Sequence, residues 1–111
     1  MGSAAQQVID QYFAAMRARD IEALLALFAE DAVMVLPDGR ELAGARSIRG
    51  MYEYLLANNA PRPTPVAAIL GTAGAATEIE TQLEDGSSRK TANFFHLDAG
   101  LIQRLSVYQR G

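Results

Sequence analysis

Two strands and a tight turn are expected in residues 89–109, which read RKTANFFHLDAGLIQRLSVYQ. On both sides of Ala99-Gly100, apolar and polar residues alternate with the period of two that is typical of a half-buried strand. Turn signals at 71–74 and at Asp85-Gly86 delimit two earlier runs of the same kind. The second half of the chain therefore predicts an antiparallel meander, with strands near 66–70, 75–84, 89–97 and 101–109.

The first half of the chain has helical spacing instead. Apolar residues recur three and four positions apart at 8–16 and again at 48–56, which predicts one helix in each stretch. Asp20 precedes a leucine-rich run that reaches Phe28, and a carboxylate at that place can cap a short helix. Three helices followed by antiparallel strands indicate an α+β fold.

Between the second and third helices, residues 33–36 predict a short strand. The turn Pro37-Asp38-Gly39 ends it, because proline presets the backbone angle at the corner of a turn. The chain of 111 residues is long enough to bury one core, and we expect a single domain over residues 1–111.

Composition narrows the possible functions. Ten Lys and Arg against thirteen Asp and Glu give a net charge of −3, which argues against nucleic-acid and anionic-membrane partners. The absence of cysteine excludes thiol chemistry, disulfides and a cysteine-based zinc site. Without a membrane-length apolar run, a signal-peptide pattern or a phosphate-binding glycine loop, we expect a cytoplasmic protein with neither metal nor nucleotide cofactor.

Strand alternation assigns side chains to the two faces of the sheet. In 89–97, Asn93 and Phe95 share the face expected to meet the helices, whereas His96 lies on the opposite face. In 101–109, alternation places Arg104, Ser106 and Tyr108 together on the presumed pocket face. The remaining apolar residues predict a homodimer formed through the outer face, and this prediction rests on Phe94, Leu105 and Val107. Arg89 and Lys90 are interpreted as solvated or cross-strand charges.

Several segments resemble the SnoaL-like and ketosteroid-isomerase-like domains of the NTF2-like superfamily. The resemblance covers nearly the whole chain and implies a cone of three helices on a curved antiparallel sheet that encloses a pocket. The segments that carry it are Tyr12-Phe13-Ala14-Ala15-Met16, Asp20-Ile21, residues 25–33, Gly44, Ile48-Arg49, residues 95–102 and Val107-Tyr108.

The resemblance also implies roles for particular residues. Tyr12 matches the tyrosine that donates a hydrogen bond to an oxyanion, and Tyr52 matches a tyrosine that bonds to it in some members. Asn93 stands where the isomerase has a protonated aspartate, and an amide donates at any pH. Leu36 stands where the isomerase has its general base, and leucine cannot move a proton.

Each candidate has a structural alternative. Tyr12, Tyr52 and Asn93 can simply be core residues with satisfied polar atoms. Asp38, the carboxylate nearest to the vacant base position, is a candidate base but also a typical turn residue. Arg104 is a candidate for binding an anionic group, or extends to solvent at the pocket mouth. Phe28, Leu36, Phe95, Ser106 and Tyr108, with Tyr52, complete the expected substrate contacts.

Two functional hypotheses follow. The first is acid/base chemistry of the isomerase or lyase type on a small apolar carbonyl compound, with Tyr12 and Asn93 as oxyanion donors. The base would be Asp38, water or the substrate itself. The second is a non-catalytic ligand-binding or dimerisation domain with a vestigial active site, which the leucine at position 36 favours.

Overall fold

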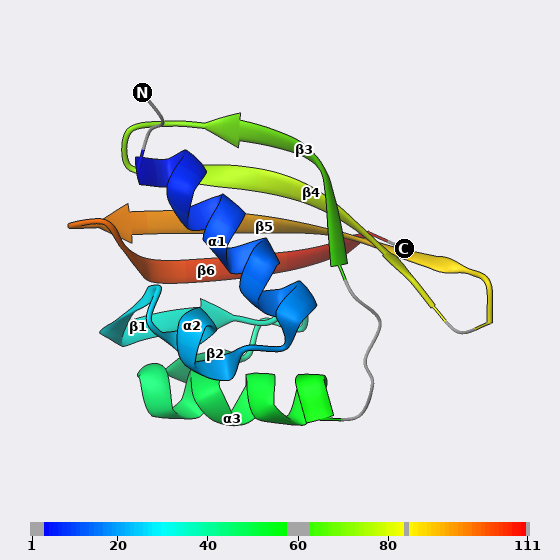
Figure 1. Ribbon diagram of the computed structural model, residues 1–111, viewed down its shortest axis with the longest axis horizontal. Helices are drawn as coiled ribbons and strands as arrows, with labels where there is room; N and C mark the ends of the chain where they lie inside the picture. The colour runs from blue at the N-terminus through cyan, green and yellow to red at the C-terminus, as the bar shows by residue number, and fades with distance from the viewer. Residues whose placement is uncertain (1–3, 58–62, 84, 111) are drawn as a thin grey trace.

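A six-stranded sheet with helices on one side forms the structure, a computed structural model that describes residues 4–57, 63–83 and 85–110 (Figure 1). The helices and the sheet together confirm the α+β prediction. The elements in chain order are α1 (Ala4–Ala18), α2 (Ile21–Leu25), β1 (Phe28–Val35), β2 (Glu41–Ala43), α3 (Ala45–Ala57), β3 (Pro63–Leu70), β4 (Gly74–Gln82), β5 (Ser88–Asp98) and β6 (Leu101–Arg110).

Helix α1 crosses the sheet with one apolar face turned toward it (Figure 1). Its buried residues recur at the spacing that places them along one side of a helix, from Val8 through Tyr12 to Met16. The helix ends where Arg19 adopts a positive φ of 56°, and the Asp20 N–H donates to the carbonyl of Ala15 at 3.0 Å.

The strands are arranged in the order β2-β1-β6-β5-β4-β3. The four C-terminal strands pair antiparallel with their neighbours, as predicted. The pairing of β1 with β6 is parallel, so the expectation of a purely antiparallel sheet is wrong at that pair. A parallel pair requires a long connection, and residues 36–100 provide it.

The first strand begins earlier than predicted. Phe28 was expected in the second helix, but that helix ends at Leu25 and Phe28 opens β1, where it pairs with Ile102. The short strand β2 was not predicted, since its three residues are too few for a periodic pattern to appear.

Strand β3 begins at Pro63 and contains a second proline, Pro65, although proline is uncommon in strands because it lacks a backbone N–H. Strand β3 is an edge strand, and the missing proline N–H groups cost no ladder hydrogen bond on its open side.

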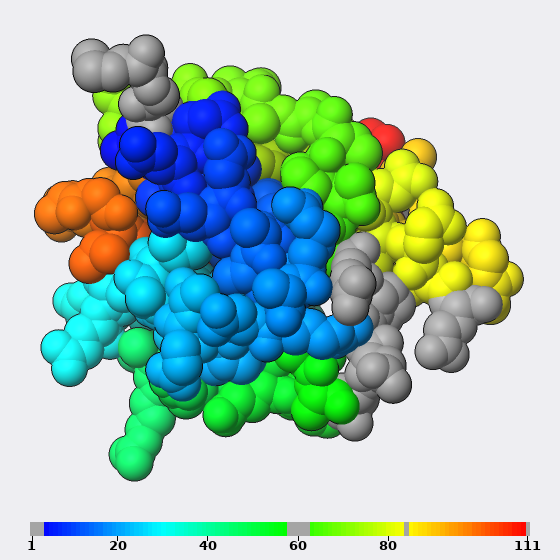
Figure 2. All heavy atoms as spheres, viewed as in Figure 1, coloured from blue at the N-terminus to red at the C-terminus, as the bar shows by residue number. Residues whose placement is uncertain are grey.

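Helices cover the inner face of the sheet. In the space-filling view, atoms of α1 and α2 occupy the front of the molecule and α3 its lower edge (Figure 2). The core lies between these helices and the sheet, and its most deeply buried members include Phe13, Leu24, Ile48, Phe95 and Leu105. No helix within the described residues is long and apolar enough to cross a membrane.

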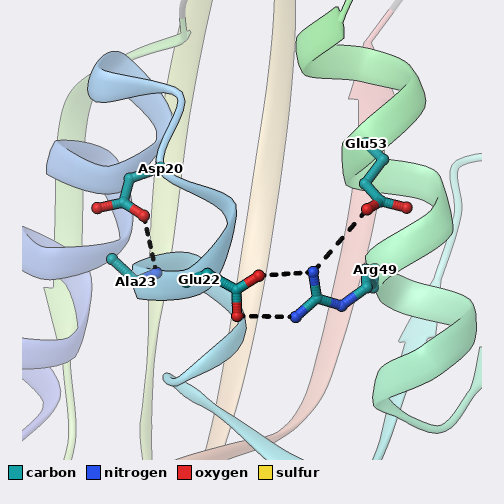
Figure 3. A network of polar contacts seen from close by, with 5 residues as sticks. All are labelled: Asp20, Glu22, Ala23, Arg49 and Glu53. Atoms are coloured by element: carbon teal, nitrogen blue, oxygen red, sulfur yellow. Dashed lines mark hydrogen bonds and ion pairs between the residues drawn. The ribbon is translucent and has the colours of Figure 1, made fainter.

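Polar contacts tie α2 to α3 on the surface (Figure 3). Asp20 caps α2 as predicted, accepting a hydrogen bond from the Ala23 N–H at 3.1 Å. The Arg49 guanidinium of α3 donates to both carboxylate oxygens of Glu22, at 2.8 and 3.0 Å, and lies 3.9 Å from Glu53. The contact with Arg49 lowers the pKa of Glu22. The position of α3, which forms one wall of the candidate site, is held mainly by its buried Ile48 and Tyr52, and these surface contacts add little.

Candidate functional site

A cavity of about 350 Å³ lies between the sheet, α1 and α3. Its volume is at the lower end of the range typical of small-molecule sites. Apolar side chains predominate in its wall. The residues that line it are Tyr12, Phe13, Met16, Met34, Leu36, Pro37, Met51, Tyr52, Leu55, Leu56, Pro63, Ile79, Thr81, Arg89, Thr91, Asn93, Val107 and Gln109.

Three buried polar side chains meet in the wall of this cavity. The hydroxyl oxygens of Tyr12 on α1 and Tyr52 on α3 are 2.6 Å apart, within hydrogen-bond distance. Asn93 on β5 lies next to Tyr12 and is placed to donate a side-chain hydrogen bond to its hydroxyl, which lowers the pKa of Tyr12. All three residues are at most 5 % exposed. The structure therefore brings together the three polar residues that the sequence analysis selected for this site.

Burial dominates the acidity of the two phenols. It raises the pKa of Tyr12 from 10.0 to about 12, although the hydrogen bonds from Tyr52 and Asn93 act in the opposite direction. Burial raises the pKa of Tyr52 as well, and its hydrogen bond with Tyr12 raises it further. Both side chains are therefore neutral hydrogen-bond donors at physiological pH.

The direction of the hydrogen bonds decides what Tyr12 can do. Either tyrosine hydroxyl can donate in the Tyr12–Tyr52 pair. When Tyr52 donates, Tyr12 accepts and keeps its own proton for a third group in the cavity. A ligand oxygen beside Tyr12 would then receive a hydrogen bond from a phenol that a second phenol and an amide support.

Aromatic rings hold the two tyrosines in place. The rings of Tyr12 and Phe95 pack edge to face with centroids 5.1 Å apart, and the rings of Phe28 and Tyr52 lie 6.1 Å apart. Phe28 and Phe95 are buried but are not among the residues that line the cavity. They pack against the tyrosines, and their predicted contact with a substrate stays a prediction that the cavity wall does not support.

The position expected for a general base faces the cavity. Leu36 follows the last residue of β1 and contributes an apolar side chain to the cavity wall. Among the described lining residues there is no carboxylate and no imidazole. The described part of its wall thus offers hydrogen-bond donors but no carboxylate or imidazole to remove a proton near neutral pH.

Asp38 does not supply that base. Its carboxylate is exposed, accepts a hydrogen bond from the Arg40 N–H at 3.0 Å and forms an ion pair with the Arg40 guanidinium at 2.7 Å. The contacts with Arg40, led by the backbone hydrogen bond, lower the pKa of Asp38. Asp38 does not line the cavity. Its placement is that of a turn residue and does not support the prediction that it acts as a catalytic base.

Three residues predicted on the pocket face lie on the outer face. Ser106 pairs with Phe94, Tyr108 with Ala92, and Arg104 with His96, and these partners all alternate with Asn93 and Phe95. The ring of Tyr108 packs against Phe94, and Arg104 lies 3.8 Å from the Glu41 carboxylate. The cause is a bulge in β6, which reverses the alternation after Ile102.

Because of the same bulge, part of the basis of the dimer prediction is wrong. Leu105 and Val107 pair with Phe95 and Asn93, so they face the helices rather than the outer surface. Of the three residues on which that prediction rested, Phe94 alone lies on the outer face, where it is 42 % exposed.

Some residues of the cavity were not selected from the sequence. Met16, Met34 and Met51 contribute flexible thioether side chains to the wall, which can adapt to a ligand's shape. Arg89 also lines the cavity, and its alternation with Asn93 along β5 was a signal that could have identified it. No group of three His, Asp or Glu side chains within the described ranges could hold a metal ion.

Comparisons with known proteins agree with this architecture. An NTF2-like protein of unknown function from Mesorhizobium loti superposes with a TM-score of 0.87 at 20 % identity, over 97 % of this chain and 92 % of that one. A candidate ketosteroid isomerase from Kribbella flavida gives 0.85 at 19 % identity, over 97 % and 78 %. A candidate polyketide cyclase from Pseudomonas putida gives 0.85 at 21 % identity, over 99 % and 93 %.

At such identities these likenesses establish the NTF2-like fold and leave the activity open. No curated protein matches the sequence. The sequence profile of the SnoaL-like domain, however, matches residues 9–105, which include Tyr12, Tyr52 and Asn93. The chain therefore belongs to the SnoaL-like domain family.

Proposed function

We propose that the cavity binds a small, largely apolar carbonyl compound, and that Tyr12 and Asn93 donate hydrogen bonds to its oxygen. The observation that carries the proposal is the buried Tyr52–Tyr12–Asn93 cluster in the wall of a largely apolar cavity. Hydrogen-bond donors in a water-poor site stabilise negative charge on an oxygen more strongly than water-exposed donors do.

Such an arrangement favours the enol or enolate form of a bound ketone. When a ketone loses a proton from a neighbouring carbon, charge develops on its oxygen, and two fixed donors lower the free energy of that state. This is the oxyanion half of isomerase or lyase chemistry. The proton acceptor must come from the substrate or from water, because no described lining residue is a carboxylate or an imidazole.

A binding experiment tests the proposal directly. The neutral probe 4-propylphenol presents an enol-like oxygen and an apolar tail, and isothermal titration calorimetry measures its dissociation constant. We expect Tyr12→Phe and Asn93→Leu each to weaken binding about tenfold, the usual effect of losing one buried hydrogen bond. The control is Tyr108→Phe, which removes a hydroxyl from the outer face. Unchanged affinity in both cavity variants would contradict the proposal.

The absence of a carboxylate or imidazole from the described lining also favours a second reading, a ligand-binding site without catalysis. The two are separated by Leu36→Asp, which adds a carboxylate to the cavity wall, and by Leu36→Asn, which adds a polar group of the same shape that is not a base. The assay follows the conversion of cyclohex-3-enone to its conjugated isomer by ultraviolet absorbance.

We expect turnover with the aspartate variant alone. That result would show a working oxyanion site in a chain without its own base. Turnover by the unmodified chain would show that this protein is itself a catalyst. Silence in the aspartate variant, with probe binding retained, would contradict the role of Tyr12 and Asn93 as oxyanion donors.

A further inference from the structure

The open end of the cavity carries a positive charge. Arg89 is the second residue of β5 and lines the cavity beside Thr81, Thr91 and Gln109, its partners and neighbours on the inner face of the sheet. Arg89 and Gln109 are exposed, so this end of the cavity meets solvent, near the β4–β5 hairpin that extends beyond the helices (Figure 1).

The guanidinium of Arg89 lacks a protein counter-ion within the described part of the chain. Every ion pair found there involves other residues: Arg40 with Asp38, Arg49 with Glu22 and Glu53, and Arg104 with Glu41. Among the described residues that line the cavity, Arg89 is the one with a formal charge. The described part of the cavity wall therefore carries a cation and no anion, although the whole chain has a net charge of −3.

Arg89 lies in the exposed part of the cavity wall and the Tyr12–Asn93 pair in its buried part. Arg89, Thr91 and Asn93 occupy alternate positions of β5, so they share one face of the sheet. Four residues of strand separate the Cα atoms of Arg89 and Asn93 by about 13 Å. Level with Thr91, between them, lie Ile79 and Gln109, whereas Val107 lies beside Asn93. The wall thus presents hydrogen-bond donors at Tyr12 and Asn93 and a cation at Arg89.

We propose that the ligand is amphipathic and that Arg89 binds its anionic group while its carbonyl or enol oxygen lies at Tyr12 and Asn93. This inference rests on the proposed function. Guanidinium binds carboxylate and phosphate oxygens in bidentate fashion, so an oxo acid or an oxo phosphate has the required chemistry. The two oxygen groups of such a ligand are separated by about 13 Å or less, the spacing of the two strand positions.

Matched probes test the inference. One is 4-(4-hydroxyphenyl)butanoate, and the second is its primary amide, which has the same shape without charge. A phosphonate of the same length distinguishes the two anionic groups. Calorimetry is performed at about 0.15 M salt, where long-range charge effects are screened. The unmodified chain should bind the acid or the phosphonate about tenfold more tightly than the amide.

Two variants locate the source of the preference. Arg89→Gln should bind all three probes with the affinity that the unmodified chain has for the amide. Lys90→Gln removes the same charge from the next residue, whose partners Glu80 and Arg110 are on the outer face, and should leave the preference intact. Circular dichroism confirms that both variants fold, as expected for exposed positions.

The outcomes separate this inference from the proposed function. Equal affinity of the unmodified chain for acid, phosphonate and amide would overturn the role of Arg89 and leave the oxyanion site standing. An equal loss of preference in Lys90→Gln would assign the effect to general charge and also overturn it. Absence of binding by all three probes would overturn the proposed function, and this inference with it.

Discussion

An amide at position 93 gives the cavity a hydrogen-bond donor that does not depend on pH. Replacing it by aspartate would make donation depend on protonation. Because Asn93 is 5 % exposed, burial should raise the pKa of the new carboxyl well above its usual range. The protonated acid donates a hydrogen bond, whereas the carboxylate repels a ligand oxygen.

For Asn93→Asp we therefore expect affinity for 4-propylcyclohexanone, a ketone whose oxygen can only accept, close to that of the unmodified chain at about pH 5, and at least about tenfold weaker at about pH 8. The unmodified chain should bind equally at both pH values. Asn93→Leu, the matched control, should be weak at both. A flat pH profile for the aspartate variant would mean that residue 93 does not contact the ligand.

The buried hydroxyl of Tyr12 has a consequence for stability in alkali. Its pKa is about 12 in the folded chain, against an ordinary value of 10.0. Between these values the unfolded chain loses the Tyr12 proton and the folded chain retains it, so ionisation favours unfolding as pH rises. The stability contribution is complete below pH 10.0 and is lost as pH rises toward 12. The free energy of unfolding falls by about 3 kcal/mol over this range, because each pH unit between the two pKa values contributes about 1.36 kcal/mol.

Urea unfolding at several pH values measures this effect. The free energy of unfolding of the unmodified chain should fall more steeply between pH 10.0 and about 12 than that of Tyr12→Phe. Tyr108→Phe, at a position that is 61 % exposed, is the control and should follow the unmodified chain. Equal slopes for all three proteins would show that Tyr12 is not held in its neutral form by burial.

Among the elements, β6 is the one whose inward-facing residues were predicted incorrectly from the sequence. Leu97 pairs with Ile102 and His96 with Arg104, so Gln103 has no partner of its own in β5. Strict alternation from Ile102 therefore selected Arg104, Ser106 and Tyr108 for the inner face. A bulge has no signature in a period-two pattern, because one extra residue changes only the phase. The Gln103 side chain donates to Asp31 at 3.1 Å, a long-range contact that the sequence does not reveal.

Features set by local chemistry or by strong periodicity were predicted well. The apolar spacing of α1 and α3, the Asp20 cap and the turns between strands are consequences of neighbouring residues. The meeting of Tyr12, Tyr52 and Asn93 was implied by the family resemblance, because three separate elements supply them. Arg89 was missed because a charge near a turn is ordinarily solvated, and the cavity that it faces exists only in the folded chain.

Replacing either of two glycines by alanine should have opposite effects on the stability of the element that contains it. Gly74 opens β4, and a Cβ there would overlap the carbonyl oxygen of Phe95 in β5. Gly50 lies inside α3 with open space around it. Gly74→Ala must displace the β4–β5 pair that carries Asn93, whereas Gly50→Ala improves helix propensity by about 1 kcal/mol.

Thermal unfolding should thus show a higher midpoint for Gly50→Ala and a lower one for Gly74→Ala, by several degrees each for a chain of this size. The affinity for 4-propylphenol should fall in the Gly74 variant and remain unchanged in the Gly50 variant. A Gly74→Ala protein of unchanged stability would contradict the close approach of β4 to the Phe95 carbonyl.

At the scale of the whole molecule, the outer face of the sheet is the large surface that the helices leave uncovered. Phe94, Tyr108 and Ile69 expose 42, 61 and 76 % of their area there. Ile69 and Phe94 both pair with Ala76, so they lie in one row across three strands. We expect a second copy of the chain to cover this face, since a two-fold axis brings the same apolar row onto itself.

Sedimentation equilibrium at micromolar concentration distinguishes a dimer from a monomer. The unmodified chain should have a mass of about 24 kDa, twice the 12.0 kDa of one chain. Phe94→Lys places a charge in the middle of the row and should give a monomer, whereas Ala14→Lys, exposed on α1, should remain a dimer. Because Phe94 points away from the cavity, the monomeric variant should still bind 4-propylphenol. A monomeric unmodified chain would contradict the dimer and leave the cavity chemistry unaffected.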